Sequence, residues 1–114
     1  METHRLVFTE DLNPYGFLFG GRLLSWADEA SYIAANQDYP KCRFVTIGMD
    51  KVEFRHSVKN GAILTIVSEQ VRKGTTSITY SVTIYSSHES PDMPIFTTNV
   101  TFVNVDESGN KIPF

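Results

Sequence analysis

The sequence predicts an α+β domain in which one antiparallel sheet curls around a single helix. Only one segment, residues 21–37, spaces its apolar residues with helical periodicity. From residue 42 onward the pattern instead repeats with a period of two, as in half-buried strands. The chain has 114 residues, which suffice for one hydrophobic core but not for two. We therefore expect a single domain over residues 1–114.

The composition argues against several classes of function. Thirteen acidic residues against ten lysines and arginines give a net charge of −3, whereas nucleic-acid binding needs clustered positive charge. No apolar stretch approaches the roughly 20 residues that span a bilayer, and the first residues do not resemble a signal peptide. The single cysteine excludes an internal disulfide framework and indicates a reducing compartment. We expect a cytoplasmic protein that binds neither nucleic acid nor membrane.

The predicted helix is lined with small residues. Leu23, Ala27, Ala30 and Ala34 share one stripe, and the alanines allow another part of the backbone to approach closely. A short β-prone run at residues 4–9 precedes the helix. Turn signals, Asn-Pro and a glycine, occupy the segment between the two.

The strands after the helix are predicted over residues 42–54, 63–72, 75–85 and 95–105. In the first of them the alternation slips phase, which predicts a β-bulge near Asp50 and Lys51. Asn60-Gly61 and Lys73-Gly74 are turn dipeptides between strand-like runs. One helix cannot cover both faces of such a sheet, so the other face is exposed or meets another copy of the chain.

Asp28 is the main candidate for chemistry. It stands in the middle of the predicted helix, where aspartate is unfavourable because its side chain competes for backbone hydrogen bonds. One interpretation is that it points to solvent or pairs with a basic residue such as Arg22. The other is a partly desolvated carboxylate that acts as a general base or nucleophile.

Two further features precede Asp28. Gly20-Gly21 is either a flexible turn or a helix N-terminus whose free N–H groups can stabilise an oxyanion. Asn13 either shapes a turn before Pro14 or hydrogen-bonds a carbonyl oxygen or a water. The three histidines lack ligand spacing, so we expect no metal.

The order of these residues resembles a known family. Asn13-Pro14-x-Gly16-x-x-Phe19-Gly20-Gly21, Asp28, Val45-Thr46-Ile47-x-Met49-Asp50 and Arg72-x-Gly74-x-x-Ser77 resemble the hot-dog-fold acyl-CoA thioesterases of the bacterial YciA and mammalian cytosolic acyl-CoA hydrolase type. The similarity covers nearly the whole chain. It implies a hot-dog fold, with a five-stranded antiparallel sheet wrapped around one central helix.

The resemblance also implies an assembly and a site. Two copies would pair into one continuous sheet with active sites at the dimer interface, and the homodimers would form hexamers as trimers of dimers. The family's helix aspartate corresponds to Asp28 and its loop asparagine to Asn13. Its coenzyme A contacts correspond to Ile47, Gly48, Met49, Thr76, Ser77 and Ile78. Arg22 departs from the family pattern, and the chain stops soon after the last strand, where many relatives carry a basic tail.

The residues suit thioester hydrolysis without a cofactor. A carboxylate that activates water and donors for the oxyanion suffice, because the thiolate leaves without strong acid assistance. We expect Asp28 to act as the base, with direct attack as the lesser alternative, while Asn13, Gly20 and Gly21 orient and polarise the carbonyl. Arg72 or Lys73 would lie near phosphate. Gly21 and Asp28 lie about 10 Å apart along a helix, so a two-fold partner is expected to complete each site.

Two other functions remain open at this point. A hot-dog dehydratase or hydratase needs a histidine near the substrate, and none lies in residues 10–36. A non-catalytic acyl-CoA sensor or a structural hot-dog domain would not need both Asn13 and Asp28.

Overall fold

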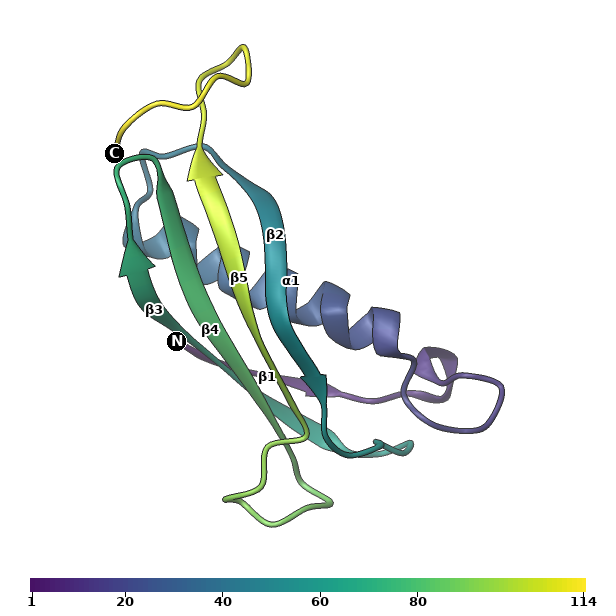
Figure 1. The fold of residues 1–114 in the computed structure, drawn as a ribbon. Helices are drawn as coiled ribbons and strands as arrows, with labels where there is room; N and C mark the ends of the chain where they lie inside the picture. The colour runs from purple at the N-terminus through teal and green to yellow at the C-terminus, as the bar shows by residue number, and fades with distance from the viewer.

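The computed structural model describes all 114 residues as one curved antiparallel sheet and one long helix (Figure 1). The elements are β1 (Glu2–Leu6), the 3₁₀ helix η1 (Thr9–Asp11), α1 (Gly20–Asp38), β2 (Phe44–Phe54), β3 (Ile63–Lys73), β4 (Ser77–Ser86) and β5 (Phe96–Asn104). The five strands lie in the order β1-β3-β4-β5-β2, and every neighbouring pair is antiparallel. The predicted fold class is confirmed.

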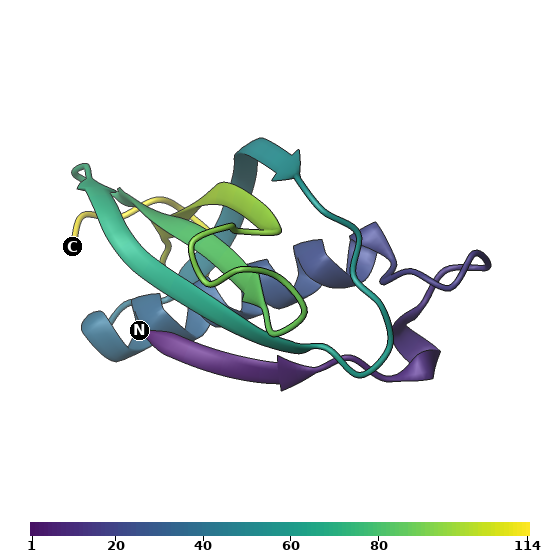
Figure 2. The ribbon, with the colours of Figure 1, turned by 90° about the horizontal axis from the view of Figure 1, so that it is seen from below.

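The sheet curves around α1, so that the helix lies against its concave face (Figure 2). Residues of β4 alternate between the two faces: Val82 and Ile84 are buried, whereas Ser81 and Thr83 are half-buried on the outer face. Hydroxyl side chains hydrogen-bond each other there, as Thr79 does with Thr101 at 2.9 Å between their Oγ1 atoms. The part of the uncovered face that β4 and β5 form is therefore polar.

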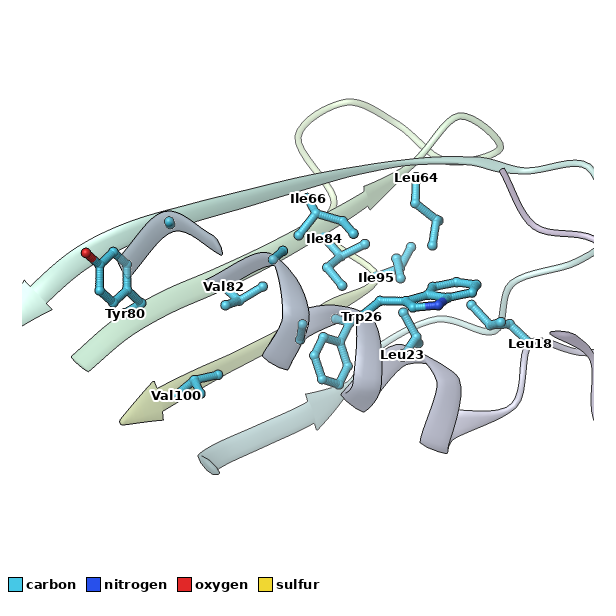
Figure 3. Close-up of a cluster of buried hydrophobic side chains, with 14 of the residues drawn as sticks. Leu18, Leu23, Trp26, Leu64, Ile66, Tyr80, Val82, Ile84, Ile95 and Val100 are labelled. Carbon is cyan, nitrogen blue, oxygen red and sulfur yellow. The ribbon is translucent and has the colours of Figure 1, made fainter. Parts of the chain in front are cut away.

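The core lies between α1 and the inner face of the sheet. Leu23 and Trp26 from the helix point toward aliphatic side chains of β3 and β4, including Leu64 and Ile84 (Figure 3). The predicted alanine stripe is buried, and Ala27 has no exposed surface. Small side chains at these positions let the sheet close around the helix.

The predicted bulge in β2 is confirmed. The register between β2 and β5 shifts between Asp50 and Glu53, and Lys51 between them has a φ of 51°. A second shift lies between Thr46 and Gly48, which the alternation did not reveal. Such irregularities bend a strand, and here they lie in the strand that borders α1 at the sheet edge.

The first strand ends earlier than predicted, at Leu6 instead of Thr9. The N–H of Phe8 donates to the Asp11 carboxylate at 2.9 Å, which turns the chain into η1.

The Asn60-Gly61 turn joins two strands that are not neighbours in the sheet. β2 lies at one edge of the sheet, and β3 lies next to the strand at the opposite edge.

The C-terminal end of α1 is tied to the sheet. The Tyr80 hydroxyl donates to Oδ2 of Asp38 at 2.5 Å. Burial, together with this hydrogen bond, holds the pKa of Tyr80 well above its usual range, so the phenol stays protonated and keeps donating. No helix of the fold combines the length and the apolar character that crossing a membrane requires.

Candidate functional site

The segment between η1 and α1 is a closed loop that holds Asn13. Oδ1 of Asn13 accepts hydrogen bonds from the backbone N–H groups of Tyr15 at 2.9 Å and Phe17 at 3.1 Å. The turn-shaping interpretation of Asn13 is therefore correct. Because the loop uses the oxygen, the amide nitrogen Nδ2 is the remaining donor of this side chain, and it makes no hydrogen bond within the chain.

The two glycines form the first turn of α1, so the interpretation as a flexible turn is wrong. The backbone N–H groups of Gly20 and Gly21 have no acceptor, and Phe19 before them offers no side-chain cap. A Cβ on Gly21 would lie 2.9 Å from the Phe19 ring, and one on Gly20 would lie 3.3 Å from the Phe54 ring. Close aromatic contacts therefore favour glycine at both positions.

A pocket of about 320 Å³ opens between this loop and the segment that follows β2. Asn13 and Gly20 line one side, residues 54–58 line the other, and Leu18 and Leu23 contribute apolar surface. The backbone hydrogen bond from Leu18 N–H to the Val58 carbonyl, at 2.7 Å, joins the two walls. The pocket thus places an amide donor beside apolar surface, which suits a polar carbonyl on an apolar chain.

His56 also lines this pocket, and sequence reasoning did not single it out. It stands in an irregular segment 43 positions after Asn13, and nothing in the local pattern distinguishes it. Only the contact between the two loops brings it beside Asn13.

Asp28 is half-buried on α1 and contacts β2. Its Oδ1 accepts a hydrogen bond from Oγ1 of Thr46 at 2.7 Å. It does not pair with Arg22, whose Nε instead lies 3.7 Å from Oδ1 of Asp11. A hydroxyl donor holds the carboxylate in place without adding a counter-charge beside it.

Thr46 belongs to the Val45-Thr46-Ile47 motif of the family resemblance, but no role was predicted for it. A threonine in a strand is ordinary, and its link to Asp28 depends on how α1 lies across β2. No local signal could have identified it.

One protomer does not bring Asp28 into the pocket that Asn13 and Gly20 line. Seven residues of helix separate Asp28 from Gly21, about 10 Å along the axis. A water that attacks a carbonyl must contact its base and lie near the oxyanion donors at once. Within a single chain the carboxylate and the donors are therefore two half-sites.

The residues predicted to contact coenzyme A lie in two separate groups, one in the middle of β2 and one at the start of β4. Ile47, Gly48 and Met49 belong to β2, where Ile47 is 54% exposed. Thr76 and Ser77 are half-buried in and after the β3–β4 turn. β5 separates β2 from β4, so one chain does not bring the two groups into contact.

The remaining residues of this prediction differ in their surroundings. The side chain of Ile78 is 1% exposed in the core, so only its backbone can face a ligand. The Lys73 ammonium lies over the rings of Tyr39 and Phe114, 4.8 Å from each centroid. Arg72 is exposed and free of ion pairs, which makes it the more available cation for a phosphate.

Comparison with known proteins gives consistent matches. The family model described as the thioesterase superfamily matches residues 15–91. A Bacillus subtilis (strain 168) protein named uncharacterized acyl-CoA thioester hydrolase YkhA is 31% identical over 111 residues, covering 94% of this chain. The match covers 63% of the Bacillus protein, so this chain spans somewhat less than two thirds of that relative's length.

Solved structures match over almost the whole chain. Cj0915, a hexameric hotdog fold thioesterase of Campylobacter jejuni, is 36% identical with a TM-score of 0.85, covering 98% of this chain and 87% of that one. The acyl-CoA hydrolase of Staphylococcus aureus, solved with butyryl coenzyme A, coenzyme A and coenzyme A disulfide, is 29% identical with a TM-score of 0.85, covering 99% of this chain and 67% of that one. The Staphylococcus enzyme has also been solved with alanine in place of an asparagine, an aspartate or a threonine.

Proposed function

The chain belongs to the thioesterase superfamily, and on that premise we propose that it hydrolyses acyl-CoA thioesters to a free acid and coenzyme A. The observation that carries the proposal is the combination of a carboxylate held in place by Thr46 with unpaired donors at Asn13 and the start of α1. The names of the Bacillus and Staphylococcus relatives support the substrate class.

Each group has a defined role in the proposed reaction. Asp28 takes a proton from a water, whose oxygen attacks the thioester carbonyl carbon. Nδ2 of Asn13 and the N–H groups of Gly20 and Gly21 stabilise the negative charge that develops on the carbonyl oxygen. The carbon–sulfur bond then breaks, and coenzyme A leaves as a thiolate.

We further propose that each site is shared between two copies of the chain. Asn13 and the glycines would come from one protomer and Asp28 from its partner, which would unite the two half-sites. The long edge strand β2 supports this arrangement, because its outer backbone edge is unpaired and Val45, Ile47 and Phe54 on it are 44%, 54% and 53% exposed. The hexameric assembly of the Campylobacter relative is consistent with such a dimer as the building unit.

The variants of the Staphylococcus enzyme support the choice of residues. Its replaced aspartate follows its replaced asparagine by fifteen positions, the same spacing as between Asn13 and Asp28. A threonine was the third residue replaced there, seventeen positions after the aspartate, whereas Thr46 follows Asp28 by eighteen positions in this chain.

The proposed coenzyme A contacts follow from the same arrangement. Ile47, Gly48 and Met49, with Thr76, Ser77 and the backbone of Ile78, would hold the pantetheine and the nucleotide, and Arg72 would contact phosphate, with Lys73 beside it. We propose a cytoplasmic location, since acyl-CoA substrates and a single unpaired cysteine both suit a reducing compartment.

The decisive test is a panel of acyl-CoAs with a thiol-trapping dye. Purified full-length protein is expected to release free thiol from at least one acyl-CoA with saturable kinetics. Binding of acyl-CoA without thiol release would contradict hydrolysis and indicate a sensor instead.

Thr46→Ala is expected to lower kcat about tenfold, because the Asp28 carboxylate loses the hydrogen bond that orients it. Thr46→Ser keeps a hydroxyl at the same place and should retain most of the activity. The measurement is steady-state kinetics on the best substrate of the panel, with thermal melting to show that both variants fold. Equal activity of Thr46→Ala and the wild type would remove Thr46 from the site.

A further inference from the structure

Asp11 lies at the base of the loop that carries Asn13, and it contacts three separate segments. Its carboxylate oxygen Oδ2 accepts a hydrogen bond from the N–H of Phe8 at 2.9 Å. Its backbone carbonyl accepts one from the N–H of Phe19, the residue before α1, at 3.0 Å. Its other carboxylate oxygen, Oδ1, lies 3.7 Å from Nε of Arg22 in the first turn of α1. Asp11 therefore joins the start of the loop to the start of the helix.

The Asp11–Arg22 pair joins a buried charge to an exposed one. The Asp11 side chain is 10% exposed, and that of Arg22 is 51% exposed. A buried carboxylate needs a compensating charge or enough hydrogen bonds, and here it has one backbone donor and one guanidinium. Removing Arg22 would leave the Asp11 carboxylate without its counter-charge, and the loop would shift to hydrate it.

Arg22 also occupies a position that the helix alone disfavours. The first turn of a helix is the positive end of its dipole, so a cation there is repelled. The unsatisfied N–H groups of Gly20 and Gly21 add to that positive potential. A favourable contact with Asp11 offsets this repulsion and accounts for the arginine at this position.

The loop is closed by contacts of its own, so its placement depends on its ties to neighbouring segments. Oδ1 of Asn13 and the bridge between Leu12 and Leu18 close it internally. Leu12 ties the loop to Thr9 in η1, and Leu18 ties it to Val58, each through a backbone hydrogen bond. The contacts of Asp11 are the ties that reach the start of α1, at Phe19 and Arg22. A change at Asp11 or Arg22 would therefore move the Asn13 amide as a unit relative to α1.

We propose that the Asp11–Arg22 pair is a clamp that sets the position of the Asn13 amide relative to the free N–H groups of Gly20 and Gly21. Both members are positioning residues: they do not contact the reacting atoms, and they act by holding the oxyanion donors in place. The inference rests on the proposed function, because those donors matter only if a thioester carbonyl is polarised between them.

The first test is Arg22→Ala in the full chain, assayed on the best substrate of the panel. We expect kcat to fall about tenfold or more while KM changes less than about twofold, since a displacement near 1 Å impairs the reaction more than binding. Arg22→Lys, whose ammonium still reaches Asp11, should restore much of kcat. Arg43→Ala is the matched control, because Arg43 lies 3.9 Å from Glu107 and is 58% exposed, at the other end of the molecule from this loop.

The second test is a double-mutant cycle with Asp11→Asn, which keeps the shape of the side chain and removes its charge. If the pair acts as one clamp, the double variant loses no more kcat than the worse single variant. The clamp would be overturned if the losses of the two single variants multiply in the double variant and appear in KM. That result would mean that Arg22 contacts coenzyme A directly. If Asp11→Asn does not fold, Arg22→Ala and Arg22→Lys decide the question.

The proposed function and the clamp can be refuted separately. A wild-type protein that cleaves no acyl-CoA would refute the proposed function. A wild-type protein that is active, beside an Arg22→Ala variant with the same kcat, would overturn the clamp alone.

Discussion

Asp28→Asn is expected to lower kcat at least about a hundredfold, the usual scale for a lost general base. The amide is nearly the same shape as the carboxylate and can still accept the hydrogen bond from Thr46, so the fold should not change. It cannot take a proton from water, which is the role assigned to Asp28. The measurement is kcat by thiol release, with the thermal midpoint as a check on folding.

Glu29→Gln provides the matched control for this prediction. Glu29 is the next residue on α1, but it faces solvent and pairs with Arg5 at 3.0 Å. Its replacement removes the same charge from the same helix and should leave kcat within about twofold, as is usual for an exposed ion pair. A fully active Asp28→Asn variant would refute the assignment of the base.

Mixed oligomers of Asn13→Ala and Asp28→Ala subunits are expected to regain activity that neither parent has. In a two-fold dimer with shared sites, a mixed pair contains one site with both wild-type residues and one with neither. Random pairing in equal amounts should therefore give about one quarter of the wild-type rate. The measurement is thiol release after the two variants are refolded together, with native mass spectrometry to confirm mixed species.

The reciprocal experiment uses a subunit that carries both substitutions. When it pairs with wild type, each shared site lacks either its asparagine or its aspartate. The activity per wild-type subunit should then fall by about half at equal amounts of the two chains. If the mixed species form but the single variants do not complement each other, each site lies within one chain and the shared-site proposal is wrong.

The local features of the fold could be predicted because their signals are local. The helix predicted over residues 21–37 runs from Gly20 to Asp38, and the phase slip at Asp50 and Lys51 marks a real bulge. Both signals depend on periodicity within one element, where each residue's face follows from its position. The end of β1 could not be predicted in this way, since the Asp11 side chain diverts the chain by binding the N–H of Phe8.

The candidate site could be predicted only in part, because some of its residues carry no local signal. Asp28, Asn13 and the two glycines stand out in the sequence because each is unusual where it stands or marks a turn. Thr46 and His56 are ordinary in their own segments. Thr46 reaches Asp28 only because β2 lies beside α1, and His56 lines the pocket only because the segment after β2 contacts the Asn13 loop.

From the sequence alone we could predict the helix, the strands, the buried face of the helix and the polar residue types of the candidate site. Those follow from side-chain volume, polarity and spacing along the chain. The partners of Asp28 and Arg22 depend on the tertiary fold: Thr46 for Asp28 and Asp11 for Arg22. Asn13 instead bonds to the backbone of its own loop, as a turn-shaping residue does. Hydrogen bonds and ion pairs act over a few ångströms. Only the folded chain brings Thr46 that close to Asp28, and Asp11 that close to Arg22.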